Sequence, residues 1–140
     1  MMIQPAQQLV SIDTSVWIEY FKTDTKDKFY NLDALIYDNL AAVCEPVIAE
    51  LLVGTKNEAQ YRNHEFFLRA NVILETPDAM WENLAQARYK LLRMGHNMNF
   101  LDLWVAYSAH YARTSLWTLD KDFEIIQKVI PFEAYKVGHV

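Results

Sequence analysis

Short strand-like runs alternate with longer helical segments along the chain, and this alternation constrains the fold more than any other feature. Runs rich in β-branched and aliphatic residues are typical of strands, whereas the intervening segments carry apolar residues at helical spacing. A strand followed by a crossover helix and a further strand predicts a mostly parallel sheet with helices on both faces. The predicted strands are residues 8–13, 41–45, 72–74, 115–119 and 132–137.

The predicted helices have recognisable ends. Pro46 suits the first position of a helix, where its missing N–H is harmless, and Gly54 suits the end of that helix. Gly95 ends the longest predicted helix in the same way. With 140 residues, the chain is long enough for one core and too short for two, so we expect a single domain over residues 1–140. The predicted helices are residues 14–22, 27–39, 46–54, 57–70, 76–94, 99–113 and 120–129.

The composition excludes several classes of protein. A hydrophobic content of 52% with only 3 Gly and 4 Pro argues against disorder. The net charge of −5 argues against binding nucleic acid by bulk charge alone, although an acidic metal site would leave room for a nuclease. No run approaches about 18 uninterrupted apolar residues, so no membrane span is expected.

The cysteine and histidine content favours a reducing compartment and argues against zinc. Cys44 is the one cysteine and lies in an apolar stretch, so we expect a small buried side chain and no disulfide within the chain. The four histidines show no zinc-ligand spacing. Residues 1–5 lack a basic region before an apolar one, so no signal peptide is predicted. We therefore expect a cytoplasmic protein.

Four separated acidic residues each lie where a predicted strand meets a helix. Asp13 and Asp120 close two strands, whereas Glu50 and Asp102 lie in the opening turns of helices. In parallel sheets, functional groups gather beyond the carboxyl ends of the strands, at the point where the strand order reverses. All four carboxylates are therefore expected to face one edge of the sheet.

Helix capping explains each of these acids taken singly but not the set. A short polar residue at a helix start is an ordinary cap, and negative charge is favoured there. Glu50 and Asp102, however, are surrounded by apolar neighbours with no adjacent Arg or Lys. A lone charge in such surroundings is costly, and carboxylates that share one pocket repel one another unless a multivalent cation neutralises them. The set therefore predicts metal-dependent phosphate chemistry.

Several stretches together resemble the PIN-domain family. They are IDTSVWIEYF at residues 12–21, EPVIAELLVG at 45–54, the spacing Asp102-x-x-Val105-Ala106, and TLDKDF at 118–123. Among PIN domains, the chain most resembles the VapC-type ribonuclease toxins of prokaryotic toxin–antitoxin pairs, in the right order over nearly its whole length. The resemblance implies a three-layer α/β/α sandwich with a mostly parallel central sheet of four to five strands. It also implies an acidic pocket that binds Mg²⁺ or Mn²⁺ and cleaves RNA, with tRNA as a candidate substrate.

The resemblance also assigns roles to individual residues. Asp13, Glu50 and Asp102 match the three core acids of the family, and Asp120 matches the fourth. All four are expected to be catalytic and to hold the metal, with Asp122 as an accessory metal ligand. Three further residues are expected to hydrogen-bond within the site or to the substrate, namely Thr14, Ser15 and Lys22. Two departures affect substrate fit: Asn99-Phe100 replaces a more polar lead-in, and Trp104 is bulkier than usual.

The resemblance further implies a cognate antitoxin, whose C-terminal segment lies across the pocket, and a homodimer. The crowded aromatic residues of the first helix, Trp17, Tyr20 and Phe21, fit either core packing or a surface for such a partner. The basic residues at 22–28 and at 88–93 fit either a solvated face or contact with RNA phosphates.

Two other functions compete with a ribonuclease. One is a non-catalytic PIN-like module that only binds RNA or protein, which the loss of an acid would indicate, and no acid is missing. The other is a phosphohydrolase or phosphotransferase of the haloacid dehalogenase type. That chemistry needs a second Asp two residues after the nucleophilic one, and Ser15 occupies this position after Asp13.

Overall fold

The computed structural model describes residues 8–22 and 29–137, and its centre is a five-stranded sheet. The strand order is β3-β2-β1-β4-β5, and every neighbouring pair is parallel. β1 lies in the middle, with Val10 opposite both Ala41 and Ser115. The strands are β1 (Val10–Ile12), β2 (Ala41–Cys44), β3 (Val72–Leu74), β4 (Ser115–Trp117) and β5 (Glu133–Ala134).

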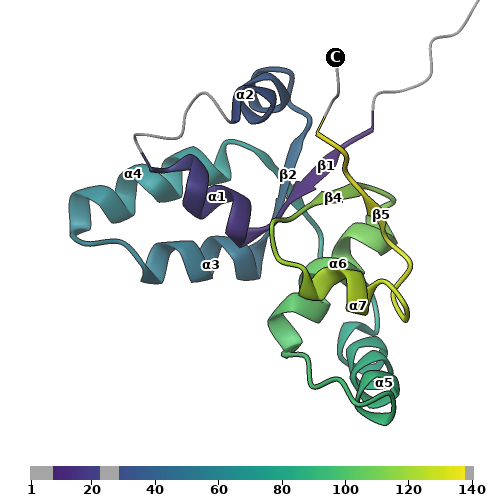
Figure 1. Cartoon of the computed structure of the whole chain (residues 1–140). Helices are drawn as coiled ribbons and strands as arrows, with labels where there is room; N and C mark the ends of the chain where they lie inside the picture. Colours follow the sequence, from purple (N-terminus) through teal and green to yellow (C-terminus); the bar gives the residue numbers. More distant parts are fainter. Residues whose placement is uncertain (1–7, 23–28, 138–140) are drawn as a thin grey trace, which may run out of the picture.

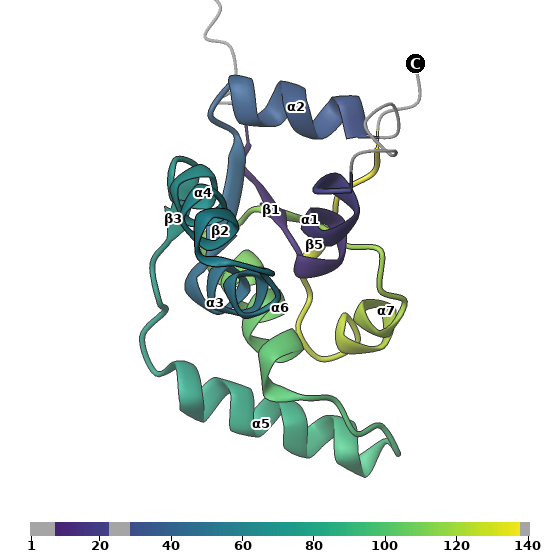
Figure 2. The same ribbon diagram turned by 90° about the vertical axis from the view of Figure 1, so that its left-hand side faces the viewer.

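Helices cover both faces of this sheet. Figure 1 shows α1 to α4 on the left side of the sheet and α5 to α7 on the right, and Figure 2 views the molecule from the left-hand side of Figure 1. This arrangement confirms the predicted three-layer α/β/α fold. The helices are α1 (Thr14–Tyr20), α2 (Tyr30–Tyr37), α3 (Glu45–Val53), α4 (Glu58–Arg69), α5 (Met80–Arg93), α6 (Phe100–Ala112) and α7 (Asp122–Ile126).

The strand order reverses between β1 and β4, and this position sets the place of the site. The chain moves outward from β1 to β2 and β3, and then crosses back to β4 on the other side of β1. The carboxyl ends of β1 and β4 are joined by a hydrogen bond of 3.0 Å from the Asp13 N–H to the Trp117 carbonyl oxygen. Parallel α/β sheets bind ligands at such a switch point.

Burial on both faces explains why the strands lack an alternating pattern. Every residue of β1, β2 and β4 is buried, as expected when helices cover both faces of a parallel sheet. α3 contributes Ile48 and α6 contributes Leu103, both at most 1% exposed. Cys44 is also buried, as predicted, and burial raises the pKa of its thiol to about 11. The thiol is therefore neutral at physiological pH.

Several predicted boundaries are wrong, each for a local reason. The strand predicted over 115–119 ends at Trp117, because the Thr118 side chain turns into the site. The strand predicted over 132–137 covers only Glu133–Ala134 in the structure, and the strand predicted over 8–13 covers only Val10–Ile12. The longest helix starts at Met80 rather than at residue 76, because Ala79 has a left-handed backbone with φ of 53°.

Helix ends shift as well. α6 ends at Ala112 because Arg113 adopts φ of 58°, and the last predicted helix, 120–129, is reduced to Asp122–Ile126. α3 begins at Glu45, so Pro46 occupies its second position. Residues 27 and 28 of the second predicted helix lie outside the described residues. None of the described helices is both long enough and apolar enough to cross a membrane.

Candidate active site

Asp13 is fixed at the carboxyl end of β1 by hydroxyl groups from both sides of the switch point. Its side chain caps α1, and the residue is 5% exposed. Asp13 Oδ2 accepts hydrogen bonds from Ser15 Oγ at 2.7 Å and from Thr118 Oγ1 at 2.8 Å. Ser15 Oγ in turn accepts from the Leu119 N–H at 3.0 Å. Within the described part of the chain, Asp13 Oδ1 accepts no hydrogen bond, so this oxygen is available to a ligand.

Asp102 lies in the first turn of α6 and is only partly compensated. The Asn99 side chain caps the helix by accepting from the Asp102 N–H at 2.8 Å, and its amide donates to Asp102 Oδ2 at 3.1 Å. Burial nevertheless raises the pKa of Asp102 from 3.8 to about 6, with added contributions from the charges of Asp13, Asp120 and Glu50. The hydrogen bond from Asn99 opposes this increase.

The pKa of Asp102 shows which predicted acids come together. Coulomb interactions weaken with distance, so charges that raise this pKa lie in its neighbourhood. Asp13, Glu50 and Asp120 all do so, and they come from β1, α3 and the turn after β4. Four carboxylates that lie far apart in the sequence therefore share one electrostatic environment.

Two consecutive hydrogen bonds connect Thr118, Asp120 and Asp122. The Asp120 N–H donates to Thr118 Oγ1 at 3.0 Å, and Asp120 Oδ1 accepts from the Asp122 N–H at 2.9 Å. Asp122 itself is exposed at the start of α7. Its role as an accessory metal ligand stays a prediction.

Glu50 lines a groove that connects the acidic group with α1 and α4. The groove encloses about 400 Å³, and Thr14, Lys22 and Glu50 all line it. The Lys22 ammonium lies 2.8 Å from Glu19 Oε1. Two of the three predicted hydrogen-bonding residues therefore face this groove, whereas Ser15 bonds Asp13 directly. Lys26 and Lys28, the other cations predicted near the first helix, lie outside the described residues.

The donor atoms of this site suit a hard divalent cation. Across residues 8–22 and 29–137, no three His, Cys, Asp or Glu side chains are close enough to hold a metal ion together directly. Asp13, Glu50 and Asp120 are close enough to Asp102 for their charges to raise its pKa, and the donors of all four acids are carboxylate oxygens. Mg²⁺ prefers such oxygens and retains several of its waters. The donor type therefore differs from the nitrogen and sulfur ligands that are typical of zinc sites.

Thr118 is a site residue that the sequence analysis missed. Its hydroxyl links Asp13 to the backbone of Asp120. The residue is part of the TLDKDF stretch, but its role depends on the adjacency of β1 and β4, which sequence position alone does not give. Its place at the carboxyl end of a predicted strand was the available signal.

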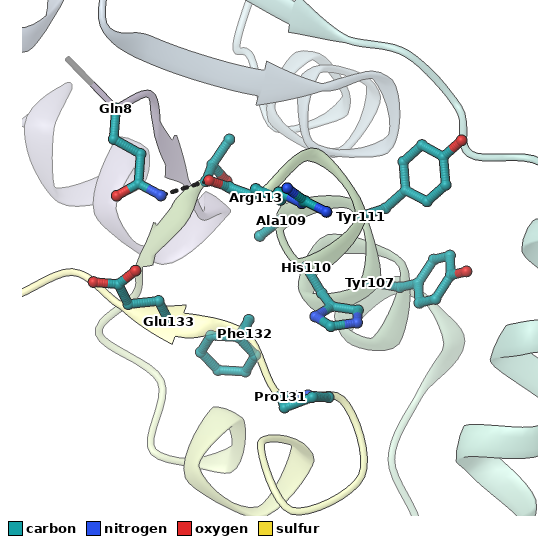
Figure 3. A pocket seen from close by; sticks show the side chains of 10 residues that line it. Gln8, Tyr107, Ala109, His110, Tyr111, Arg113, Pro131, Phe132 and Glu133 are labelled. Atoms are coloured by element: carbon teal, nitrogen blue, oxygen red, sulfur yellow. Dashed lines mark hydrogen bonds between the residues drawn. The ribbon is translucent and has the colours of Figure 1, made fainter. Parts of the chain in front are cut away.

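A separate cavity of about 530 Å³ lies at the opposite edge of the sheet (Figure 3). It is lined by residues that precede β1 and β4, including Gln8 and Arg113, and by His110 and Tyr107 of α6. The Gln8 amide donates a hydrogen bond to the Arg113 carbonyl oxygen. None of the predicted site residues lines this cavity.

A family model described as the PIN domain matches residues 10–129, which is most of the chain. The chain belongs to the PIN-domain family. It is 25% identical over 130 residues to a VapC ribonuclease of Mycobacterium bovis and to ribonuclease VapC11 of Mycobacterium tuberculosis. Each alignment covers 90% of this chain and 97% of the relative. The predicted resemblance to PIN domains of the VapC type is confirmed.

Solved structures show the same fold. The VapBC2 complex of Rickettsia felis, bound to a DNA fragment from its promoter, matches with a TM-score of 0.73 and 20% identity, covering 91% of this chain and 97% of that one. VapBC-1 of nontypeable Haemophilus influenzae matches with a TM-score of 0.72 and 20% identity, covering 91% and 96%. At this identity, the likeness establishes the architecture.

Proposed function

We propose that this PIN domain is a divalent-metal-dependent endoribonuclease, the toxin of a toxin–antitoxin pair. The observation that supports this proposal most is the gathering of Asp13, Glu50, Asp102 and Asp120 around the switch point, where their charges raise the pKa of Asp102. The named relatives are ribonucleases, and the similar solved structures are toxin–antitoxin complexes. The substrate class is therefore RNA, with tRNA as a candidate.

The four acids would hold Mg²⁺ or Mn²⁺, directly or through water. Such an ion, when bound, supplies an activated water and neutralises charge on the phosphoryl oxygens. Ser15 and Thr118 occupy one oxygen of Asp13 and so aim the other at the site. Asn99 holds Asp102 in the first turn of α6 in the same way. Asp120 is placed to orient the attacking water, and Asp122 to assist from the edge.

Cleavage of a total tRNA pool tests the proposal. The wild-type protein should cut it in Mg²⁺ and not in EDTA, whereas Asp102→Asn should lose at least 100-fold in rate, as removal of a central electrostatic group typically does. Glu124→Gln is the matched control, because Glu124 is an exposed carboxylate on α7 outside the group of four. RNA binding without cleavage by the wild-type protein would support the alternative, a non-catalytic RNA-binding module.

We further propose that the groove beside Glu50 receives the antitoxin. Its wall includes the apolar side chains of Ile18, Phe21 and Leu51, with the carboxylate of Glu50 also lining it. Ile18 is 48% exposed, which is unfavourable unless a partner covers it. An apolar segment that carries a cation matches this combination. Trp17, by contrast, is fully buried and belongs to the core.

Co-purification tests the antitoxin site. Ile18→Asp should release a co-expressed antitoxin, whereas Tyr37→Asp, an equally drastic change at an exposed residue of α2, should not. Retention of the antitoxin by both variants would place the contact elsewhere. Homodimer formation stays a prediction, which sedimentation equilibrium of the antitoxin-free protein would measure.

A further inference from the structure

The outward face of α5 presents aromatic rings that the core does not use. Trp81 is 62% exposed and Tyr89 is 59% exposed, and their spacing of eight residues places both on one side of the helix. Leu84 and Leu91 are fully buried, on the side of the helix that faces away from Tyr89. The guanidinium of Arg93 lies 5.1 Å from the centre of the Tyr89 ring. An exposed ring thus lies against a cation.

This face continues onto the helix that carries Asp102. The Trp81 ring meets Phe100 at 5.9 Å and Trp104 at 5.4 Å between ring centres, both edge-on. Phe100 is 39% exposed and precedes Asp102 by two residues. In Figure 2, α5 crosses the lower end of the molecule beside the start of α6. The exposed rings therefore extend from α5 to the first turn of α6. Asp102 lies in the same turn, although the spacing of two residues places its side chain and that of Phe100 on different sides of the helix.

Arg88 holds this arrangement in place. Its guanidinium lies 4.9 Å from the centre of the Phe100 ring. Arg88 Nε donates to the Met98 carbonyl oxygen and Nη2 donates to Asn97 Oδ1, both at 2.8 Å. The Arg88 side chain thus holds the segment between α5 and α6 and also contacts the Phe100 ring. A ligand that stacks on Phe100 therefore meets an ordered ring, and this lowers the entropic cost of binding.

The charge on α5 is opposite to that of the whole chain. Within Met80–Arg93 there are three cations, Arg88, Lys90 and Arg93, and one acid, Glu82, whereas the chain carries a net charge of −5. A basic helix on an acidic protein suits a polyanion. A second copy fits less well, because its own α5 also carries more cations than acids and therefore complements this charge less than a polyanion does.

We propose that the α5 face, defined as Trp81, Tyr89, Arg93 and Phe100, binds single-stranded RNA. Its rings stack on bases, and the Arg93 guanidinium beside Tyr89 contacts phosphates, as in other proteins that bind single strands. The inference rests on the proposed ribonuclease function and deepens it, because RNA held here lies against the first turn of α6, which also carries Asp102.

Fluorescence anisotropy with a labelled 12-nucleotide single-stranded RNA, in EDTA so that no cleavage occurs, tests this face. Tyr89→Ala and Trp81→Ala should each weaken binding by about tenfold, the usual effect of one lost stacking contact. Arg93→Gln should lower the slope of log affinity against log salt by about 0.7. The matched controls on α4 are Phe66→Ala, which removes an exposed ring, and Arg62→Gln, which removes an exposed charge. Neither should change binding.

Tyr89→Ala decides the result, because Tyr89 contacts Arg93 rather than the core, so its replacement leaves the fold intact. Unchanged RNA affinity in Tyr89→Ala would overturn the inference. So would conversion of a wild-type dimer to a monomer by the same change, because the face would then be a subunit interface. The proposed catalysis is tested separately. If the wild-type protein binds RNA through α5 but leaves it intact in Mg²⁺, the nuclease proposal alone is contradicted. If the wild-type protein cleaves RNA but Tyr89→Ala binds RNA as tightly as the wild type, the α5 face alone is contradicted.

Discussion

The carboxyl end of β1 and the start of α6 hold two carboxylates of the same site in opposite ways. Asp13, at the end of β1, is buried, caps a helix and accepts hydrogen bonds from Ser15 and Thr118. Asp102, at the start of α6, receives one side-chain hydrogen bond, and its pKa is raised to about 6 by burial and by three neighbouring carboxylates. One acid stabilises the fold, whereas the other is held against electrostatic repulsion.

This difference shows how a site can be rigid and yet attract a cation. The hydrogen bonds of Asp13 order the junction of β1 and β4, so that the geometry of the site exists before any ligand binds. The charge of Asp102 adds to the negative charge of its neighbours, and a divalent ion would neutralise this charge. Removing the two acids should therefore change the stability of the metal-free protein in opposite directions.

The largest predicted effect is the loss of stability in Asp13→Ala. This change removes a helix cap and leaves the hydroxyls of Ser15 and Thr118 without their acceptor. We expect the free energy of unfolding to fall by about 2–3 kcal/mol, which urea denaturation in EDTA would measure. An unchanged unfolding midpoint would show that the hydrogen bonds at the end of β1 contribute nothing. Asp13→Asn, which retains one acceptor oxygen, should lose less.

The second effect is stabilisation by a divalent cation. If the four acids bind Mn²⁺ in the folded state alone, a free Mn²⁺ concentration of ten times its dissociation constant should raise the free energy of unfolding of the wild-type protein by about 1.4 kcal/mol. The gain should disappear in Asp102→Asn and persist in Glu124→Gln. Thermal denaturation at pH 7 with and without Mn²⁺ measures it, and an equal gain in all three proteins would assign the ion to other surface acids.

Asp102→Asn should stabilise the metal-free protein. Because the folded pKa of Asp102 is raised to about 6, its contribution to stability is complete below 3.8 and is lost as the pH rises through 6. At pH 7.5 the charged side chain therefore costs about 1 kcal/mol, after allowance for screening by solvent. Denaturation at pH 4.5 and pH 7.5 should show less loss of stability with rising pH in Asp102→Asn than in the wild type. Parallel curves for the two proteins would mean that neither burial nor the neighbouring charges raise the pKa of Asp102 in the folded protein.

The smallest effect concerns Asp122, which lies at the edge of both regions. Its N–H donates a hydrogen bond to Asp120 Oδ1, and the residue is exposed at the start of α7. If Asp122 is an accessory ligand, Asp122→Asn should lower the affinity for Mn²⁺ by only about two- to fivefold, whereas Asp102→Asn should lower it by about tenfold or more. Isothermal titration calorimetry separates the two, and equal losses would place Asp122 among the central ligands.

The sequence was sufficient for the sheet, whereas the catalytic and metal-binding roles of the acids stay a prediction. Buried parallel strands have continuous apolar runs, so β1 and β2 were visible, and the acids stood out against apolar neighbours. The start of α5 was placed wrongly, because Thr76-Pro77-Asp78 has the composition of a helix start whereas the left-handed backbone of Ala79 delays it. Thr118 was missed because its role arises from contact across two strands.

Paramagnetic broadening by Mn²⁺ is the most direct test of the shared cation site. In a two-dimensional amide spectrum of the labelled protein, substoichiometric Mn²⁺ should broaden the amides of Ser15, Asn99 and Leu119, which lie beside Asp13, Asp102 and Asp120, respectively. We predict that these signals disappear together and before those of Asp38 and Glu133, which are exposed acids at the opposite edge of the sheet. Broadening at the end of β1 without broadening at the start of α6, or uniform broadening at all acidic residues, would contradict a common site.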